Sequence, residues 1–126
     1  MSSLITNQRQ FGPITIVDLR GSIDLGEASL TLRRTIRDLV ERARTKIILN
    51  LSQVNSMDSA GVGELAGAYV PVKSKGGDLK FLNPTKKVYD MLKITQLDKV
   101  FEVYIDEQTA IRSFSGSAGE TPPSLT

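Results

Sequence analysis

The apolar residues of this chain fall into short runs and longer periodic stretches. Short runs rich in β-branched residues and bounded by Gly, Pro or polar turns predict strands. Four such strands are expected, at residues 14–19, 47–51, 79–82 and 101–105, and residues 4–9 are expected to pair with the first as a hairpin. The second of them is apolar almost throughout, which indicates a strand that is covered on both faces.

Apolar residues spaced three and four positions apart predict helices between and after these strands. The longest covers residues 27–44. A second begins after Ser59 and is expected to end or kink at Pro71, because proline has no amide hydrogen to donate. A third begins after Pro84, and Asp106 is expected to cap a fourth.

Strands that alternate with helices predict an α/β fold of one domain. We expect a mostly parallel central sheet with an N-terminal hairpin strand and four helices packed mainly on one side. Residues 1–114 are assigned to this domain, and residues 115–126, rich in Ser, Gly and Pro, to a disordered tail. Loops that leave the carboxyl ends of parallel strands carry function in such sheets, which points to residues 21–26 and 52–63.

The composition argues against several classes of function. The chain has no Cys and no His, so it lacks thiolate chemistry, a Ser-His-Asp triad and a His-built zinc site. Its net charge of +2 is too balanced to imply direct binding to nucleic acid. No apolar stretch approaches the ~18 residues of a membrane span, and the start does not resemble a signal peptide. We therefore expect a cytoplasmic protein that is not an enzyme, with no cofactor, no metal, no catalytic residue and no membrane partner.

The loop before the second helix concentrates the candidate functional residues. Asp58 and Ser59 stand where the helix begins, with free backbone amides just beyond them. Gly61 and Gly63 lack side chains and would let another surface approach the backbone, and Met57 offers an adaptable apolar contact. A helix cap with glycines for tight internal packing explains the same residues equally well.

The run Met57-Asp58-Ser59-Ala60-Gly61-Val62-Gly63 resembles the signature loop of anti-sigma factor antagonists. These proteins are single-domain members of the sulfate transporter and anti-sigma antagonist (STAS) family. Gly21-Ser22-Ile23-Asp24 is similar to the family's turn after its second strand, where an acidic residue usually stands. The likeness extends in the same order through residues 47–52, 75–79 and 92–101, and so spans about residues 4–114.

This resemblance implies a phosphorylation switch at Ser59. In the family, the serine after the aspartate accepts phosphate from an anti-sigma factor that is itself an ATP-dependent serine/threonine kinase. The unphosphorylated antagonist binds this kinase and releases the sigma factor, phosphorylation abolishes the binding, and a PP2C-type phosphatase resets the cycle. The implied partner-binding residues are those around the acceptor: Asp24, Met57, Asp58, Ala60, Gly61, Val62 and Gly63.

The sequence departs from the family pattern at three positions. Ala60 stands where many relatives carry a second hydroxyl residue, which leaves Ser59 as the single acceptor of the core motif. Ser22 stands where an acidic residue is often found, so in the first loop the resemblance supports Asp24 as a partner-binding residue more strongly than Ser22. Pro71 interrupts a helix that is usually continuous.

Three other interpretations use the same loop. A serine hydrolase would place its nucleophile at such a turn, but Met57 replaces the first glycine of G-x-S-x-G and no histidine exists. A phospho-receiver would use Asp58 as the acceptor and would need neighbouring carboxylates to bind Mg²⁺. Asp24 is the single carboxylate that the sequence offers for this, which is weak support for such a site. A STAS scaffold of a stress-signalling complex, or a small STAS subunit of a membrane transport system, would use the same surface without a phosphorylation cycle. The sequence leaves this last alternative open.

Overall fold

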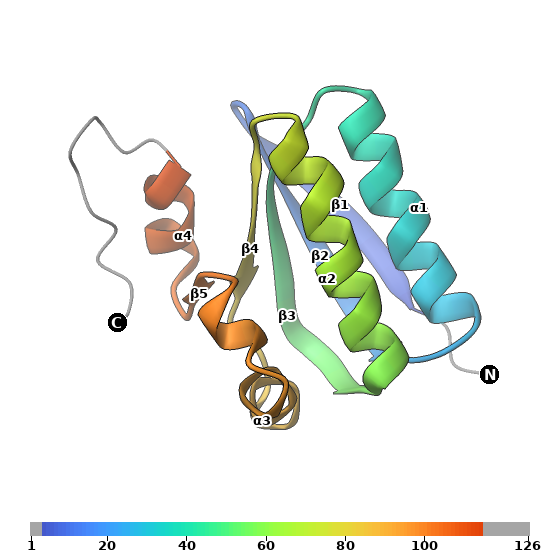
Figure 1. Ribbon diagram of the computed structural model, residues 1–126. Helices are drawn as coiled ribbons and strands as arrows, with labels where there is room; N and C mark the ends of the chain where they lie inside the picture. The colour runs from blue at the N-terminus through green and yellow to red at the C-terminus, as the bar shows by residue number, and fades with distance from the viewer. Residues whose placement is uncertain (1–3, 115–126) are drawn as a thin grey trace.

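A five-stranded sheet in the order β1-β2-β3-β4-β5 forms the centre of the computed structural model, which describes residues 4–114 (Figure 1). β1 pairs antiparallel with β2, and the remaining neighbours are parallel. The predicted mostly parallel sheet with an N-terminal hairpin is therefore confirmed. The expected disordered tail, residues 115–126, lies outside the described residues. The strands are β1 Ile5–Phe11, β2 Ile14–Ile23, β3 Lys46–Met57, β4 Asp78–Leu82 and β5 Val103–Tyr104.

Of the four helices in residues 4–114, three cover one face of the sheet and the fourth covers the other. The larger core joins alternate strand residues such as Leu49 and Phe81 to α1, α2 and α3. The smaller core joins Ile16 and Ile48 to Ala110 of α4. This alternation follows from the two-residue period of a strand, and it confirms the prediction of helices mainly on one side. The helices are α1 Glu27–Glu41, α2 Ser59–Ser74, α3 Lys86–Ile94 and α4 Glu107–Phe114, with a short 3₁₀ turn at Leu97–Lys99.

The strand β3 is longer than the sequence predicts, and the expected polar loop before Ser59 is wrong. The register against β2 passes from Asp18↔Asn50 to Arg20↔Gln53, and from Gly21↔Val54 to Ser22↔Ser56. Each step contains one extra residue on β3, as in a β-bulge. The buried residues Leu51, Val54 and Met57 therefore recur every three positions rather than every two, and this spacing hid the strand.

The helix α2 does not end at Pro71, which was one of the two predicted outcomes, but continues to Ser74. Proline removes the hydrogen bond to the carbonyl four residues earlier, here that of Gly67. Gly67 and Pro71 both lie on the exposed side of the helix, where water can satisfy that carbonyl. The last turn is held by Val72, which is fully buried in the core.

Other boundaries shift by a few residues. β2 continues to Ile23, so half of the expected first loop is strand. α1 ends at Glu41, and Ala43 just beyond it has a positive φ of 62°. β5 has two residues instead of five. The predicted cap of α4 is confirmed, since the amide of Thr109 donates to Asp106 over 2.9 Å.

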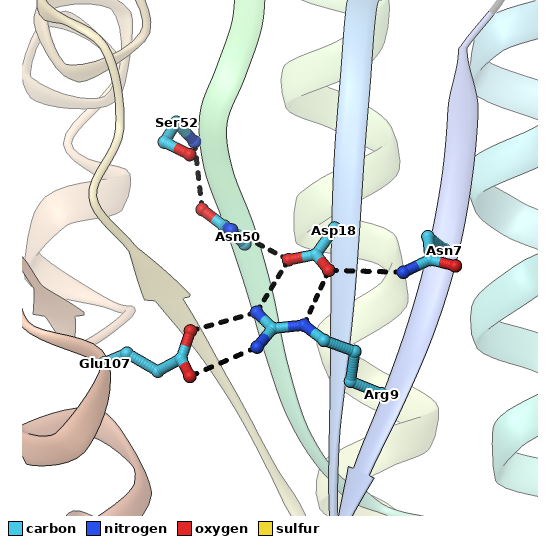
Figure 2. A network of polar contacts seen from close by, with 6 residues as sticks. All are labelled: Asn7, Arg9, Asp18, Asn50, Ser52 and Glu107. Atoms are coloured by element: carbon cyan, nitrogen blue, oxygen red, sulfur yellow. Dashed lines mark hydrogen bonds and ion pairs between the residues drawn. The ribbon is translucent and has the colours of Figure 1, made fainter.

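A polar network fastens α4 to the sheet (Figure 2). The guanidinium of Arg9, on β1, donates to Asp18 over 2.7 and 2.9 Å and to Glu107 over 2.9 and 3.2 Å. The amide of Asn50 donates to the same Asp18 carboxylate over 2.8 Å. Partial burial of Asp18 opposes its ionisation, but the hydrogen bonds from Arg9 and Asn50 outweigh burial and lower its pKa. The hairpin and the last helix, far apart in sequence, are thereby linked.

Replacing Asp18 with Asn is expected to lower the free energy of unfolding at pH 7 by about 1–2 kcal/mol, because Arg9 loses one of its two charged acceptors. The carboxylate of Asp18 has a lower pKa when folded than when unfolded. Its contribution is therefore present above about pH 4 and lost as the pH falls below that. Urea unfolding from pH 7 to pH 3 should show a shallower acid slope for Asp18→Asn than for the unchanged chain.

The matched control is Asp90→Asn. Asp90 pairs with Lys86 over 3.0 Å on the exposed side of α3, and such a pair contributes less than about 0.5 kcal/mol. Equal losses for the two variants would contradict the role given to Asp18.

Candidate functional site

The carboxyl ends of β2 and β3 meet beneath the start of α2, and Asp58 connects them. Its carboxylate accepts from the amide of Gly61 over 2.9 Å, which caps α2. The other oxygen accepts from the amide of Leu25 over 3.1 Å. The backbone amide of Asp58 donates to Ile23 over 3.3 Å. Asp58 thus links the two loops predicted to carry function, whose strands already pair as far as Ile23 and Met57.

Asp58 is held in its ionised form. The backbone amides of Gly61 and Leu25 lower the pKa of its carboxyl group below the ordinary value. The side chain is also exposed. A fixed negative charge therefore stands directly before Ser59 at neutral pH.

Ser59 is the first residue of α2, and its side chain is exposed. The first amides of a helix have no partner within it and attract negative charge. A phosphate on Ser59 would lie at this end of α2, one residue from the Asp58 carboxylate. The position is accessible to another protein and does not require the fold to open.

The exposed face of α2 carries no charge for three turns beyond Ser59. The residue types that face solvent are small or apolar, and 65% of Val70 is exposed. The one charged residue between Ser59 and Val72 is Glu64, which accepts from the Nε of Arg33 on α1 over 3.2 Å. A surface helix normally has a polar outer face. This uncharged strip, which we call the α2 face, consists of Ser59, Gly63, Ala66, Gly67, Val70 and Pro71.

The two glycines of the loop have different roles. A Cβ on Gly61 would lie 2.2 Å from the carbonyl oxygen of Ile23 and 2.8 Å from Met57 Cγ, so this glycine serves the internal contact between α2 and β2. A Cβ on Gly63 would meet nothing within 4 Å. Gly63 also borders a groove between α1 and α2. Of the two, only Gly63 presents bare backbone at the surface.

The remaining expected residues are divided between core and surface. Met57 is 6% exposed and belongs to the core, so its side chain offers little area to a partner, contrary to expectation. Asp24 is half-buried, and its carbonyl accepts from Ser29 over 3.1 Å at the start of α1. Ala60 and Val62 are half-buried beside Ser59.

Leu25 is a surface residue that the sequence reasoning missed. It is 78% exposed and lies in the turn between β2 and α1, within hydrogen-bonding distance of Asp58. Exposure of a leucine side chain to water is unfavourable in free energy, and binding of another surface over it removes that cost. The sequence could have indicated it, because Leu25 is an apolar residue in a turn, between Asp24 and Gly26, and does not belong to the apolar pattern of a strand or a helix.

Comparison with known proteins identifies the family. The STAS domain family matches residues 6–110. This chain belongs to the STAS domain family. Among STAS proteins, the anti-sigma-B factor antagonist of Bacillus subtilis is 31% identical over 87 residues, which are 69% of this chain and 78% of that protein.

Solved STAS structures share the fold. An anti-sigma factor antagonist from Mycobacterium paratuberculosis has a TM-score of 0.80 at 21% identity, covering 90% of this chain and 95% of its own. The Bacillus antagonist SpoIIAA in its unphosphorylated form has a TM-score of 0.77 at 24% identity, covering 91% and 100%. Its phosphorylated form has a TM-score of 0.68 at 22% identity, covering 87% and 99%. The STAS fold predicted from the sequence is confirmed. Within residues 4–114, no helix is long and apolar enough to cross a membrane.

Proposed function

We propose that this STAS protein is an anti-sigma factor antagonist controlled by phosphorylation of Ser59. In its unphosphorylated form it binds an anti-sigma factor that is also a serine/threonine kinase, and this binding releases the sigma factor. The kinase transfers the γ-phosphate of ATP to the Ser59 hydroxyl, and the complex dissociates. A PP2C-type phosphatase in the cytoplasm hydrolyses the phosphoserine and restores binding.

The observation that carries this proposal is an exposed serine next to a fixed carboxylate at one end of an uncharged helix face. Phosphate would add a charge of about −1.5 to −2 at neutral pH. Within a closed interface, this charge and that of Asp58 would be desolvated together, which is unfavourable. In the free protein, the exposed end of α2 leaves the phosphate hydrated. Phosphorylation therefore weakens binding to the partner and leaves the fold intact.

The relatives support the same conclusion. The similar proteins from Bacillus subtilis and Mycobacterium paratuberculosis are named as antagonists of anti-sigma factors. SpoIIAA has been solved both unphosphorylated and phosphorylated. In this chain Ser59 is the single hydroxyl residue of the motif from Met57 to Gly63, because the next residue is Ala60.

Calorimetry with the anti-sigma factor kinase encoded nearest to this chain tests the proposal. Titration without ATP should give a saturable complex. Preincubation of this chain with the kinase and ATP, followed by its repurification, should abolish that complex, and a PP2C-type phosphatase should restore it. Binding that is equally strong before and after phosphorylation would instead favour a STAS scaffold.

The α2 face offers a second test of where the partner binds. Val70→Asp places a charge near the C-terminal end of this uncharged strip and is expected to weaken kinase binding by at least ~10-fold. Because 65% of Val70 is exposed, the free energy of unfolding should change by less than about 0.5 kcal/mol. Binding is measured by calorimetry and stability by urea unfolding.

Ile94→Asp is the control for this variant. Ile94 is 78% exposed at the end of α3 and is not one of the residues of the α2 face. It should leave the affinity within about twofold, in the range of surface changes outside an interface. Equal weakening by both variants would remove the α2 face from the binding surface.

A further inference from the structure

The outer edge of β1 is long and regular, and no strand among the described residues pairs with it. Within residues 4–114, β1 pairs only with β2, and its seven residues keep an unbroken register. Five of the seven are exposed, including Ile5 at 57% and Phe11 at 42%. The opposite edge of the sheet, β5, has only two residues.

Protective features of edge strands are missing from β1. Natural sheets guard such edges with Lys, Pro, bulges or very short strands, because the free amides and carbonyls pair readily with another strand. The segment contains neither Lys nor Pro. Its one charge, Arg9, is paired with Asp18 and Glu107 on the face that carries α4. β1 itself therefore presents no unpaired charge to a second chain at this edge.

The hairpin geometry determines which main-chain groups point outward. Gly12 and Pro13 form a two-residue turn, with a positive φ of 58° at Gly12, so Phe11 and Ile14 form its hydrogen-bonded closing pair. Hydrogen-bonded and non-hydrogen-bonded pairs alternate along an antiparallel ladder. The amides and carbonyls of Thr6, Gln8 and Gln10 therefore face away from β2.

This outward set is complementary to itself. If two copies of β1 pair antiparallel about Gln8, Gln8 opposes Gln8 and Thr6 opposes Gln10. All the outward groups then form hydrogen-bonded pairs. On the α4 side of the sheet, Ile5 of each copy opposes Phe11 of the other in a non-hydrogen-bonded pair, where side chains are closest. The two exposed apolar residues of β1 cover each other in the same register.

We propose that two copies of this chain associate through β1, in antiparallel register about Gln8, to form one continuous ten-stranded sheet. The two-fold axis is perpendicular to the sheet, so both sets of α1, α2 and α3 lie on the same side. The carboxyl ends of β2 and β3 point in opposite directions in the two copies. Both Ser59 surfaces stay accessible, and the dimer presents two of them, which raises the avidity for a partner that is itself dimeric.

The contact is a strand of seven residues, about 24 Å long, at the low end of interface sizes. We expect a weak dimer with a dissociation constant on the order of 100 µM. Sedimentation velocity of the full 126-residue chain, from about 10 µM to about 1 mM, should show a concentration-dependent shift from monomer to dimer. A monomer throughout this range would overturn the proposal.

Gln8→Pro tests the register. It removes an outward amide while leaving the β1–β2 hydrogen bonds intact, and proline is tolerated at edge positions of this kind. It should raise the dissociation constant at least ~10-fold. Gln8→Thr keeps the amide and should stay within about twofold. Circular dichroism shows whether Gln8→Pro remains folded.

Ile5→Lys provides an independent variant with the main chain unchanged. It places a charge opposite Phe11 of the other copy and should raise the dissociation constant at least ~5-fold. A dimer that persists in both Gln8→Pro and Ile5→Lys would overturn the β1 interface. Kinase binding by either monomeric variant is a separate readout, so failure of the dimer leaves the antagonist function to its own test.

Discussion

Ser59→Asp is expected to lose binding to the anti-sigma factor kinase by at least ~100-fold, whereas Ser59→Ala binds as the unchanged chain does. A factor of one hundred corresponds to about 3 kcal/mol of binding free energy. The loss arises because a second carboxylate next to Asp58 is desolvated within the interface. Alanine removes the acceptor hydroxyl without adding charge. Calorimetric dissociation constants for the three proteins check this prediction.

Stability measurements separate this effect from unfolding. Ser59 is exposed and lies at the first position of α2. A negative charge at this position interacts favourably with the helix dipole. Ser59→Asp should therefore unfold at the same urea concentration as the unchanged chain, or slightly higher. Ser59→Asp that binds as tightly as Ser59→Ala would contradict a switch based on charge.

Gly61→Ala is expected to lower the free energy of unfolding by about 2–3 kcal/mol. The added methyl group would overlap the Ile23 carbonyl oxygen, 2.2 Å from the ideal Cβ position. Relief of this overlap requires α2 to move away from the end of β2. That movement would also stretch the hydrogen bond between Asp58 and Leu25. Urea unfolding monitored by circular dichroism measures the loss.

Gly63→Ala is the matched control, two residues along the same helix. Its Cβ would meet nothing within 4 Å, and alanine is the better helix former. We expect an increase in stability of about 0.5–1 kcal/mol. Equal effects of the two substitutions would show that Gly61 has no special contact.

The fold could be predicted from the sequence because its elements carry simple patterns. The strand at Ile47 to Leu51 is apolar except for Asn50, and α1 repeats its buried residues at helical spacing. Turn residues and caps such as Asp106 gave most boundaries within a few residues. The β3 bulges could not be predicted, because an inserted residue on one strand is defined only by its pairing with the other.

The continuation of α2 past Pro71 also depended on the tertiary structure. Proline lowers local helix stability, but Leu65, Ala68 and Val72 hold α2 to the core on both sides of it. Packing of this kind outweighs the tendency of proline to end a helix, and it cannot be read from the sequence near Pro71.

The candidate site was found only in part. The motif located Asp58 and Ser59, and the structure joins their loop to the first one through Leu25. Met57 and Gly61 belong to the interior, because bulged pairing turns Met57 inward and α2 packs tightly on Ile23. Sequence patterns do not distinguish a glycine required by internal packing from one left open to a partner.

Phosphate mapping tests the central claim most directly. The chain is incubated with ATP and the kinase encoded nearest to it, or with lysate of its source, and is examined by intact-protein and peptide mass spectrometry. The account predicts one phosphate, located on Ser59, and none on Ser59→Ala. No phosphate, or a phosphate that persists on Ser59→Ala, would contradict it.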